Sequence, residues 1–209
     1  TVKSAKLEVN DLPVFYFPRI TFPISNKRSS GLLFPAVGIN RQNGFDYLQP
    51  IYWNIAPNYD ATLIPRYISE RGAAFGGEFR HLSTWAKTEL NGQWLFNDLG
   101  GKEVTKKSEN SDHTRQTRYL ASLNHLGGVG HPWTTFINLN KVSDGDYFND
   151  LGTQFLTERS LTHLQRVTMA SYKKGYWSYG IETEDYQVIS QDIEEQYSVL
   201  PRIFVDGYF

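Results

Sequence analysis

Histidine is the residue that most often transfers protons in hydrolytic enzymes, and this chain contains five of them. They are spread along the chain at His81, His113, His125, His131 and His163. A hydrolase needs a base beside a nucleophile, or two facing carboxylates, and no serine or aspartate lies at a recognised spacing from these histidines. A lone histidine is most often structural, so we expect no catalytic residues and no enzyme.

A group of acidic residues could bind calcium instead. Asp144, Asp146 and Asp150 supply carboxylate oxygens from one loop, but the loop lacks the ligand and glycine pattern of an EF-hand. We therefore favour a solvated loop over a Ca²⁺ site. The glycine-rich run HLGGVG at 125–130 opens no helix and is a weak candidate for a phosphate cradle. Because the chain has no cysteine, a thiolate metal site is excluded, and we expect no metal and no cofactor.

The elements that carry these residues are strands, because apolar and polar residues alternate with a period of two almost everywhere. In residues 86–96, Leu90 and Trp94 fall on an apolar face, and Gln93 falls on a polar one. The expected strands are 30–40, 44–53, 60–70, 73–82, 86–96, 115–126, 132–142, 161–173, 176–184 and 199–209. About ten residues is longer than a usual strand and close to the length that crosses a bilayer at a tilt. The sequence predicts an all-β, antiparallel transmembrane barrel, of which this chain supplies about ten strands.

The expected connections fall into two kinds. They are short at 83–86, 127–131 and 173–176, and long and polar at 97–114, 143–160 and 189–198. The long loops follow every second strand, so all of them leave the same end of the sheet, as in an outer-membrane barrel. A soluble carbohydrate-binding sandwich that stacks sugars on Trp85, Trp133 and Trp177 is the alternative without a membrane.

Composition and charge exclude several classes of protein. The 209 residues include 21 basic and 22 acidic residues, so the net charge of −1 gives no general attraction for nucleic acid. An aromatic content of 15% argues against a disordered chain. No run approaches the roughly 20 apolar residues of a membrane-spanning helix. We therefore expect a folded β protein that does not bind nucleic acid.

Prolines mark two unusual places. Pro35 lies in the middle of the expected strand 30–40 and Pro50 near the end of 44–53, and each removes a donor from the ladder. We expect such prolines only at a sheet edge or a bulge. Before them, prolines interrupt an apolar segment that ends in two cations, and we expect an irregular linker there rather than a paired strand. Its apolar and cationic residues are Phe15, Tyr16, Phe17, Phe22, Lys27 and Arg28.

Several of these runs resemble the LptD family of lipopolysaccharide-assembly proteins of the Gram-negative outer membrane. The runs are PVFYFPRITFPISNKRSS at 13–30, GLLFPAVG at 31–38, YWNIAPNYDATLIPRY at 52–67, GGEFRHL at 76–82 and SDGDYFNDL at 143–151. The resemblance implies a periplasmic β-jellyroll that feeds a very large barrel, through which lipopolysaccharide reaches the outer leaflet. It implies three partners besides outer-membrane lipid: lipopolysaccharide, the lipoprotein LptE inside the barrel, and the periplasmic bridge protein LptA at the jellyroll.

The resemblance also divides the chain and assigns residues. Residues 1–14 would end the jellyroll, 15–29 would form the apolar linker, and 30–209 would form the N-terminal strands of the barrel, with the N-terminus in the periplasm. Pro35 and Pro50 match a lateral gate, where the first and last strands part so that the lipid leaves sideways. The linker would be a lipid passage whose cations bind lipid A phosphates.

Each of these assignments has an alternative. The prolines could simply be tolerated at a strand edge, and the linker could be a packed hinge with solvated charges. The cysteines that the family pairs between jellyroll and barrel and the later strands are missing here, which indicates a fragment. Because the chain ends in Tyr208-Phe209, and bacterial barrels often finish on an aromatic residue, a self-contained, porin-like barrel of about ten strands is the structural alternative.

Overall fold

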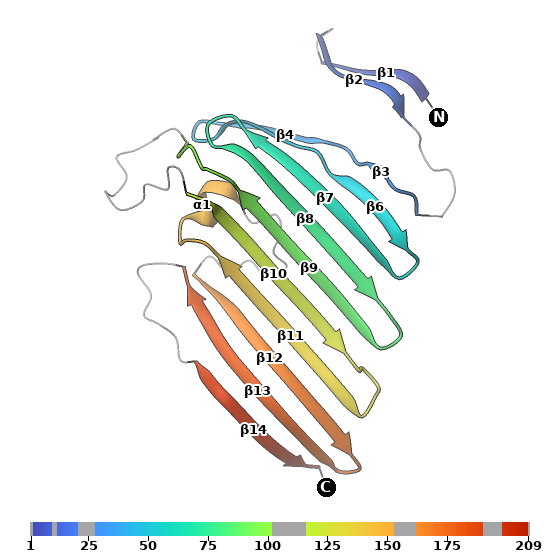
Figure 1. Ribbon diagram of the computed structural model, residues 1–209, viewed down its shortest axis with the longest axis vertical. Helices are drawn as coiled ribbons and strands as arrows, with labels where there is room; N and C mark the ends of the chain where they lie inside the picture. The colour runs from blue at the N-terminus through green and yellow to red at the C-terminus, as the bar shows by residue number, and fades with distance from the viewer. Residues whose placement is uncertain are drawn as a thin grey trace.

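The computed structural model describes residues 2–9, 12–20, 28–101, 116–152, 162–189 and 198–208 (Figure 1). Every paired strand is antiparallel, which confirms the all-β prediction. The strands form a two-stranded sheet at the N-terminus and one sheet of twelve strands.

The two-stranded sheet pairs β1 (Val2–Val9) with β2 (Leu12–Ile20). The expectation that residues 15–20 form an irregular segment is therefore wrong, because Phe15, Tyr16 and Phe17 belong to a paired strand. Both strands of a two-stranded sheet are edges, where a missing N–H donor such as that of Pro18 is tolerated. Phe22 and Lys27 of the expected linker lie outside the described residues.

The large sheet is a meander whose strands follow one another in chain order, except near its first edge (Figure 1). Its strands are β3 (Gly31–Leu32), β4 (Ala36–Asn40), β5 (Gly44–Leu48), β6 (Ile51–Ala56), β7 (Tyr59–Ile68), β8 (Gly72–Leu82), β9 (Ala86–Leu95), β10 (Arg118–Gly127), β11 (Trp133–Val142), β12 (His163–Lys174), β13 (Trp177–Val188) and β14 (Val199–Gly207). Strands β7 to β13 have 10 to 12 residues, as the sequence predicts.

The sheet is open. Its order ends at β4 on one side and at β14 on the other, and no pairing joins these edges among the described residues. The closed barrel of about ten strands, the alternative raised above, is therefore not observed. Across the same described ranges, no helix is long and apolar enough to cross a membrane.

The two faces of the sheet differ in character. On β9, Leu90 and Trp94 are 49% and 40% exposed, whereas Gln93 is only 2% exposed. Leu90 pairs with Phe79 of β8, which is also exposed, so the apolar face continues across neighbouring strands. A sandwich would cover such a face with a second sheet, whereas here it is open to the surroundings.

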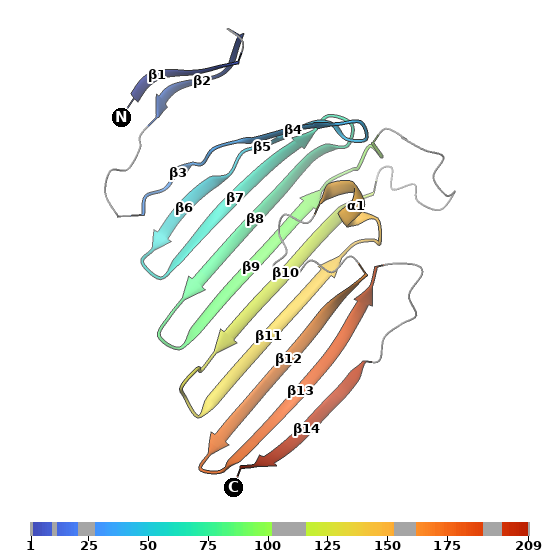
Figure 2. The same ribbon diagram turned by 180° about the vertical axis from the view of Figure 1, so that it is seen from behind.

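The opposite face carries polar side chains and a covering loop. Helix α1 (Tyr147–Leu151) lies over this face at one end of the sheet (Figure 2). Its side chains join a buried apolar cluster with residues of β7 to β12: Ile68, Ala74, Leu95, Leu120, Val142 and Leu164, together with Tyr147, Phe148, Leu151 and Ile189. The expectation of a solvated loop at this position is therefore wrong.

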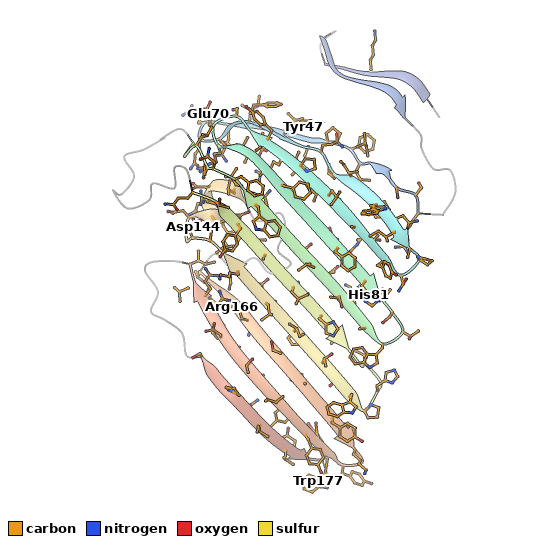
Figure 3. The ribbon with its side chains drawn as sticks, viewed as in Figure 1. Tyr47, Glu70, His81, Asp144, Arg166 and Trp177 are labelled. Atoms are coloured by element: carbon orange, nitrogen blue, oxygen red, sulfur yellow. The ribbon has the colours of Figure 1, made fainter. Side chains whose placement is uncertain are left out.

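The connections confirm the predicted asymmetry. The long connections 96–117, 143–162 and 189–198 leave one end of the sheet, and the turns at 83–85 and 175–176 lie at the other. Figure 3 shows Glu70 and Asp144 at the long-loop end, and His81 and Trp177 at the opposite end. The shorter turns β4–β5 and β7–β8 also lie at the long-loop end, so only the later loops there are long.

Candidate functional site

The first two expected strands are each broken at their proline. Residues 33–35, which include Pro35, separate β3 from β4, and residues 49–50, which include Pro50, separate β5 from β6. The breaks face each other, because Leu32 pairs with Ile51 on one side and Ala36 pairs with Leu48 on the other. Three residues thus oppose two, as in a bulge. Both prolines therefore lie where the sequence predicts, at an edge and a bulge.

Few hydrogen bonds cross this double break. Among the described residues, a single backbone hydrogen bond joins the segments 33–35 and 49–50, from the Leu33 N–H to the Pro50 carbonyl at 2.9 Å. The Pro50 nitrogen carries no proton, so it cannot donate back. The edge is also apolar and exposed, with Phe34 and Ile39 each 80% exposed. The pairing of the first strand with the second is thus weakest at its middle.

Pro65 extends the weakness to a third strand. The sequence suggests a bulge here, but β7 is continuous and Pro65 pairs in register with Phe75 of β8. Its carbonyl accepts from the Gln49 N–H at 3.0 Å. Because proline has no N–H, the return hydrogen bond from Pro65 to Gln49 cannot form. Pro35, Pro50 and Pro65 therefore each remove a backbone N–H donor from neighbouring segments of the sheet.

Arg28, a predicted lipid-binding cation, is held by a buried acid. Asp60, at the start of β7, is 3% exposed. Its carboxylate accepts from Arg28 at 2.9 Å, from Arg80 at 2.8 Å and from the Tyr52 hydroxyl at 2.9 Å. The Asn54 amide also donates to the Arg28 carbonyl at 3.1 Å. These contacts anchor the chain that enters the large sheet, and Arg28 is paired rather than simply solvated.

The loop acids belong to a buried ion-pair network. Arg118 of β10 contacts Asp144 at 2.7 Å, Asp150 at 2.8 Å and Asp98 at 3.1 Å. Arg71 contacts Asp98 at 2.9 Å and Asp150 at 3.1 Å. The Arg118 side chain is 1% exposed and that of Asp98 is fully buried. Asp144 and Asp150 are thus charge partners of arginine, which corrects the expectation of a solvated loop.

Further hydrogen bonds complete the attachment of α1. The Tyr147 hydroxyl donates to Gln93 Oε1 at 2.8 Å, and Arg66 donates to the Leu151 carbonyl at 3.0 Å. Burial raises the pKa of the Tyr147 phenol above its ordinary value, so the hydroxyl keeps the proton that it donates. The Asn43 amide donates to the Asp150 carbonyl at 2.6 Å. The loop is therefore bonded to several strands at once.

The histidines that the structure describes do not form a catalytic arrangement. The ring nitrogens of His125 contact the hydroxyls of Thr88 and Thr135 at 2.8 and 3.0 Å, across three neighbouring strands. His113 lies outside the described residues. No group of three or more acids, histidines or cysteines that could hold a metal occurs in the part of the chain that is described.

Reasoning from the sequence missed Asp60, Arg71 and Arg118. Strand alternation marks Asp60 and Arg118 as strand residues but does not tell whether their face is solvated or covered, and Arg71 lies in the turn between β7 and β8. The one available signal was an acid inside the specific run YWNIAPNYDAT, where Asp60 is the only charged residue. For Arg118, the sequence offers no comparable signal, because its partners come from loops.

Comparison with known proteins agrees with the fold and the runs of similar sequence. The family model described as LPS transport system D, LptD, matches residues 116–208. The curated LPS-assembly protein LptD of Alkalilimnicola ehrlichii is 37% identical over 99% of this chain and 25% of its own length. Those of Saccharophagus degradans and Xanthomonas oryzae pv. oryzae are 37% and 38% identical, over 100% and 98% of this chain and 26% and 24% of theirs.

These relatives match the chain nearly end to end. The chain spans about a quarter of the length of the curated relatives it matches. It therefore belongs to the LptD family and represents one segment of such a protein.

Proposed function

We propose that this chain is the N-terminal part of an outer-membrane barrel that transports lipopolysaccharide and inserts it into the outer leaflet. The open apolar face of strands β7 to β14 supports a position in the bilayer, because lipid-facing residues alternate with residues that face a polar lumen. The strand lengths of 10 to 12 residues match a tilted crossing. Membership of a transport family supports a role without catalysis.

We propose that the short-turn end faces the periplasm and the long-loop end faces the outside of a Gram-negative cell. Long external loops and short periplasmic turns are typical of bacterial barrels. The chain enters the large sheet at Arg28, beside the short β6–β7 turn. That entry suits a periplasmic N-terminus, with residues 1–14 ending a jellyroll that receives lipopolysaccharide from LptA.

The double break is the single observation that carries the proposed mechanism. Pro35 and Pro50 each delete one donor, and a hydrogen bond is worth about 0.5–1.5 kcal/mol net and more where no water can replace it. Two missing bonds next to the seam where the first and last strands part lower the cost of opening that seam by about 1–3 kcal/mol, or roughly ten- to a hundredfold in open population. Lipopolysaccharide would leave sideways through this gate while its sugars pass through the lumen.

The linker and the lumen have complementary roles in this proposal. Phe15, Tyr16 and Phe17 would form an apolar passage for acyl chains together with Phe22. Lys27 would bind a lipid A phosphate, and Arg28 could contribute only through the half of its side chain that Asp60 leaves exposed. The polar face of the sheet suits a lumen that holds the lipoprotein LptE.

The test is to restore the missing donors. Pro35→Ala and Pro50→Ala together, in the full-length protein, should lower lipopolysaccharide delivery to the cell surface and admit large hydrophobic antibiotics. Pro132→Ala, in the turn between β10 and β11, is the matched control and should change neither measurement. A double variant that assembles to normal levels with an intact permeability barrier would refute the gate.

A further inference from the structure

The side chain of Gln49 spans the double break. Gln49 lies between β5 and β6, directly before Pro50. Its amide nitrogen Nε2 is 2.8 Å from the Leu33 carbonyl and 3.1 Å from the Pro50 carbonyl. Its amide oxygen Oε1 accepts from the Tyr47 hydroxyl at 3.0 Å. One carboxamide therefore connects the first strand, the second strand and a neighbouring tyrosine.

The bond to Leu33 replaces one that proline removes. In an antiparallel ladder, a hydrogen-bonded pair of residues exchanges two bonds, one in each direction. The Leu33 N–H donates to the Pro50 carbonyl, but Pro50 has no N–H to return to the Leu33 carbonyl. Gln49 Nε2 donates to that same carbonyl. The side chain thus supplies the donor that the backbone lacks.

We propose that Gln49 is a positioning residue that holds the first strand, which borders the gate, against the second strand across the break. A side-chain bond differs from a ladder bond in one respect: rotation about the side-chain torsions releases it while β4–β5 and β3–β6 remain paired. The prolines weaken the pairing of the first strand with the second, and Gln49 keeps these two strands together at rest. The effect of Gln49 on lipopolysaccharide delivery rests on the proposed function, whereas the hydrogen bond from Gln49 to the Leu33 carbonyl does not.

The chemistry requires both the length and the amide of glutamine. Methionine has a similar length without a donor, and glutamate has the same length but at neutral pH presents only acceptors to the two carbonyls. Both substitutions remove the bridge and leave the strand pairs untouched. The loss of one hydrogen bond should raise the ratio of open to closed pairing between segments 33–35 and 49–50 by about two- to tenfold.

The experiment measures hydrogen exchange in the full-length protein in lipid nanodiscs. In Gln49→Met and Gln49→Glu, amide exchange over residues 31–36, which contain the Leu33 N–H, should accelerate about two- to tenfold. Exchange over β9 should stay the same. The matched control is Gln187→Met, because Gln187 also bridges to backbone, contacting Val142 N at 3.1 Å and Val142 O at 2.8 Å, but far from the break.

The outcomes separate the bridge from the gate. Faster exchange over residues 31–36 in both Gln49 variants, and not in Gln187→Met, supports the bridge. Unchanged exchange in either assembled variant overturns it, whatever the proline variants do. Lipopolysaccharide delivery is measured on the same variants: faster exchange with unaltered delivery would keep the bridge and contradict the gate. If Gln49→Met does not assemble, Gln49→Glu, which keeps the polarity of the site, decides the matter.

Discussion

Replacing Arg118 by methionine should release the α1 loop from the sheet. Arg118 is almost fully buried and is bonded to Asp144, Asp150 and Asp98. Its removal takes one arginine from all three acids, of which Asp98 and Asp150 keep their contacts with Arg71. Breaking a buried ion pair by removing one partner costs about 3–5 kcal/mol, because the partner charges stay buried without compensation.

The size of the effect can be stated for particular amide groups. The Asp150 N–H donates to the Asp146 carbonyl at 3.0 Å, and the Gly152 N–H donates to the Phe148 carbonyl at 3.1 Å. If the loop opens as a unit, a loss of about 3–5 kcal/mol lowers their protection from hydrogen exchange by roughly two to four orders of magnitude. Exchange of the peptide that covers α1 measures this directly in the folded protein.

Two further variants test the electrostatic reasoning. Arg202→Met breaks the pair with Glu182, in which the arginine side chain is 62% exposed, and should change protection little because exposed ion pairs contribute about 0–1 kcal/mol. Adding Asp144→Asn to Arg118→Met removes the charge of one acid that has lost its contact with Arg118, and should recover part of the lost protection. If protection of α1 in Arg118→Met stays within threefold of the parent protein, or if Arg202→Met has an equal effect, the reasoning fails.

Three other predictions concern the faces, the ends and the anchor of the sheet. Leu90→Arg should destabilise the folded barrel by about 2–4 kcal/mol in a lipid-vesicle folding assay. Gln93→Arg should also destabilise it, because Gln93 is buried beneath α1. If Gln93→Arg has no effect on stability, the loop does not cover this face. A cysteine at Leu99 should react with an impermeant maleimide on intact cells and one at Lys174 should not, and the reverse result would invert the topology. Asp60→Asn, which removes the charge that holds the entering chain, should increase protease cleavage just before the large sheet, and unchanged cleavage would exclude this anchor.

Strand alternation predicted the parts of the fold that depend on local pattern. The face of β9 that carries Leu90 and Trp94 was predicted correctly, because the side chains of a strand alternate regardless of its neighbours. Pro35 and Pro50 were placed at an edge or a bulge by a second local argument, because proline lacks the N–H that a ladder hydrogen bond needs. Both predictions follow from one residue or one strand.

The features that depend on distant contacts were not predicted. The sequence marks Asp144 and Asp150 as polar, but only the folded chain brings Arg71 and Arg118 to them and makes the loop a buried cover. Likewise, the sequence places Gln93 on a polar face but does not show that α1 covers it. Pairing of residues 15–20 was missed because local reasoning counts a proline as a break, although an edge strand tolerates it.

The central claim is that lipid leaves the barrel at the gate beside the double break, and site-specific photo-crosslinking of newly made lipopolysaccharide tests it most directly. A photoreactive residue is placed either at Phe34, which is 80% exposed beside the break, or at Ile203, which is 79% exposed on β14. We expect crosslinks at Phe34 during delivery, and fewer of them when Pro35→Ala and Pro50→Ala are combined. The number of crosslinks at Ile203 should not change in the proline variants. Equal crosslinking at both positions, or crosslinking at Phe34 that the proline variants leave unchanged, would contradict it.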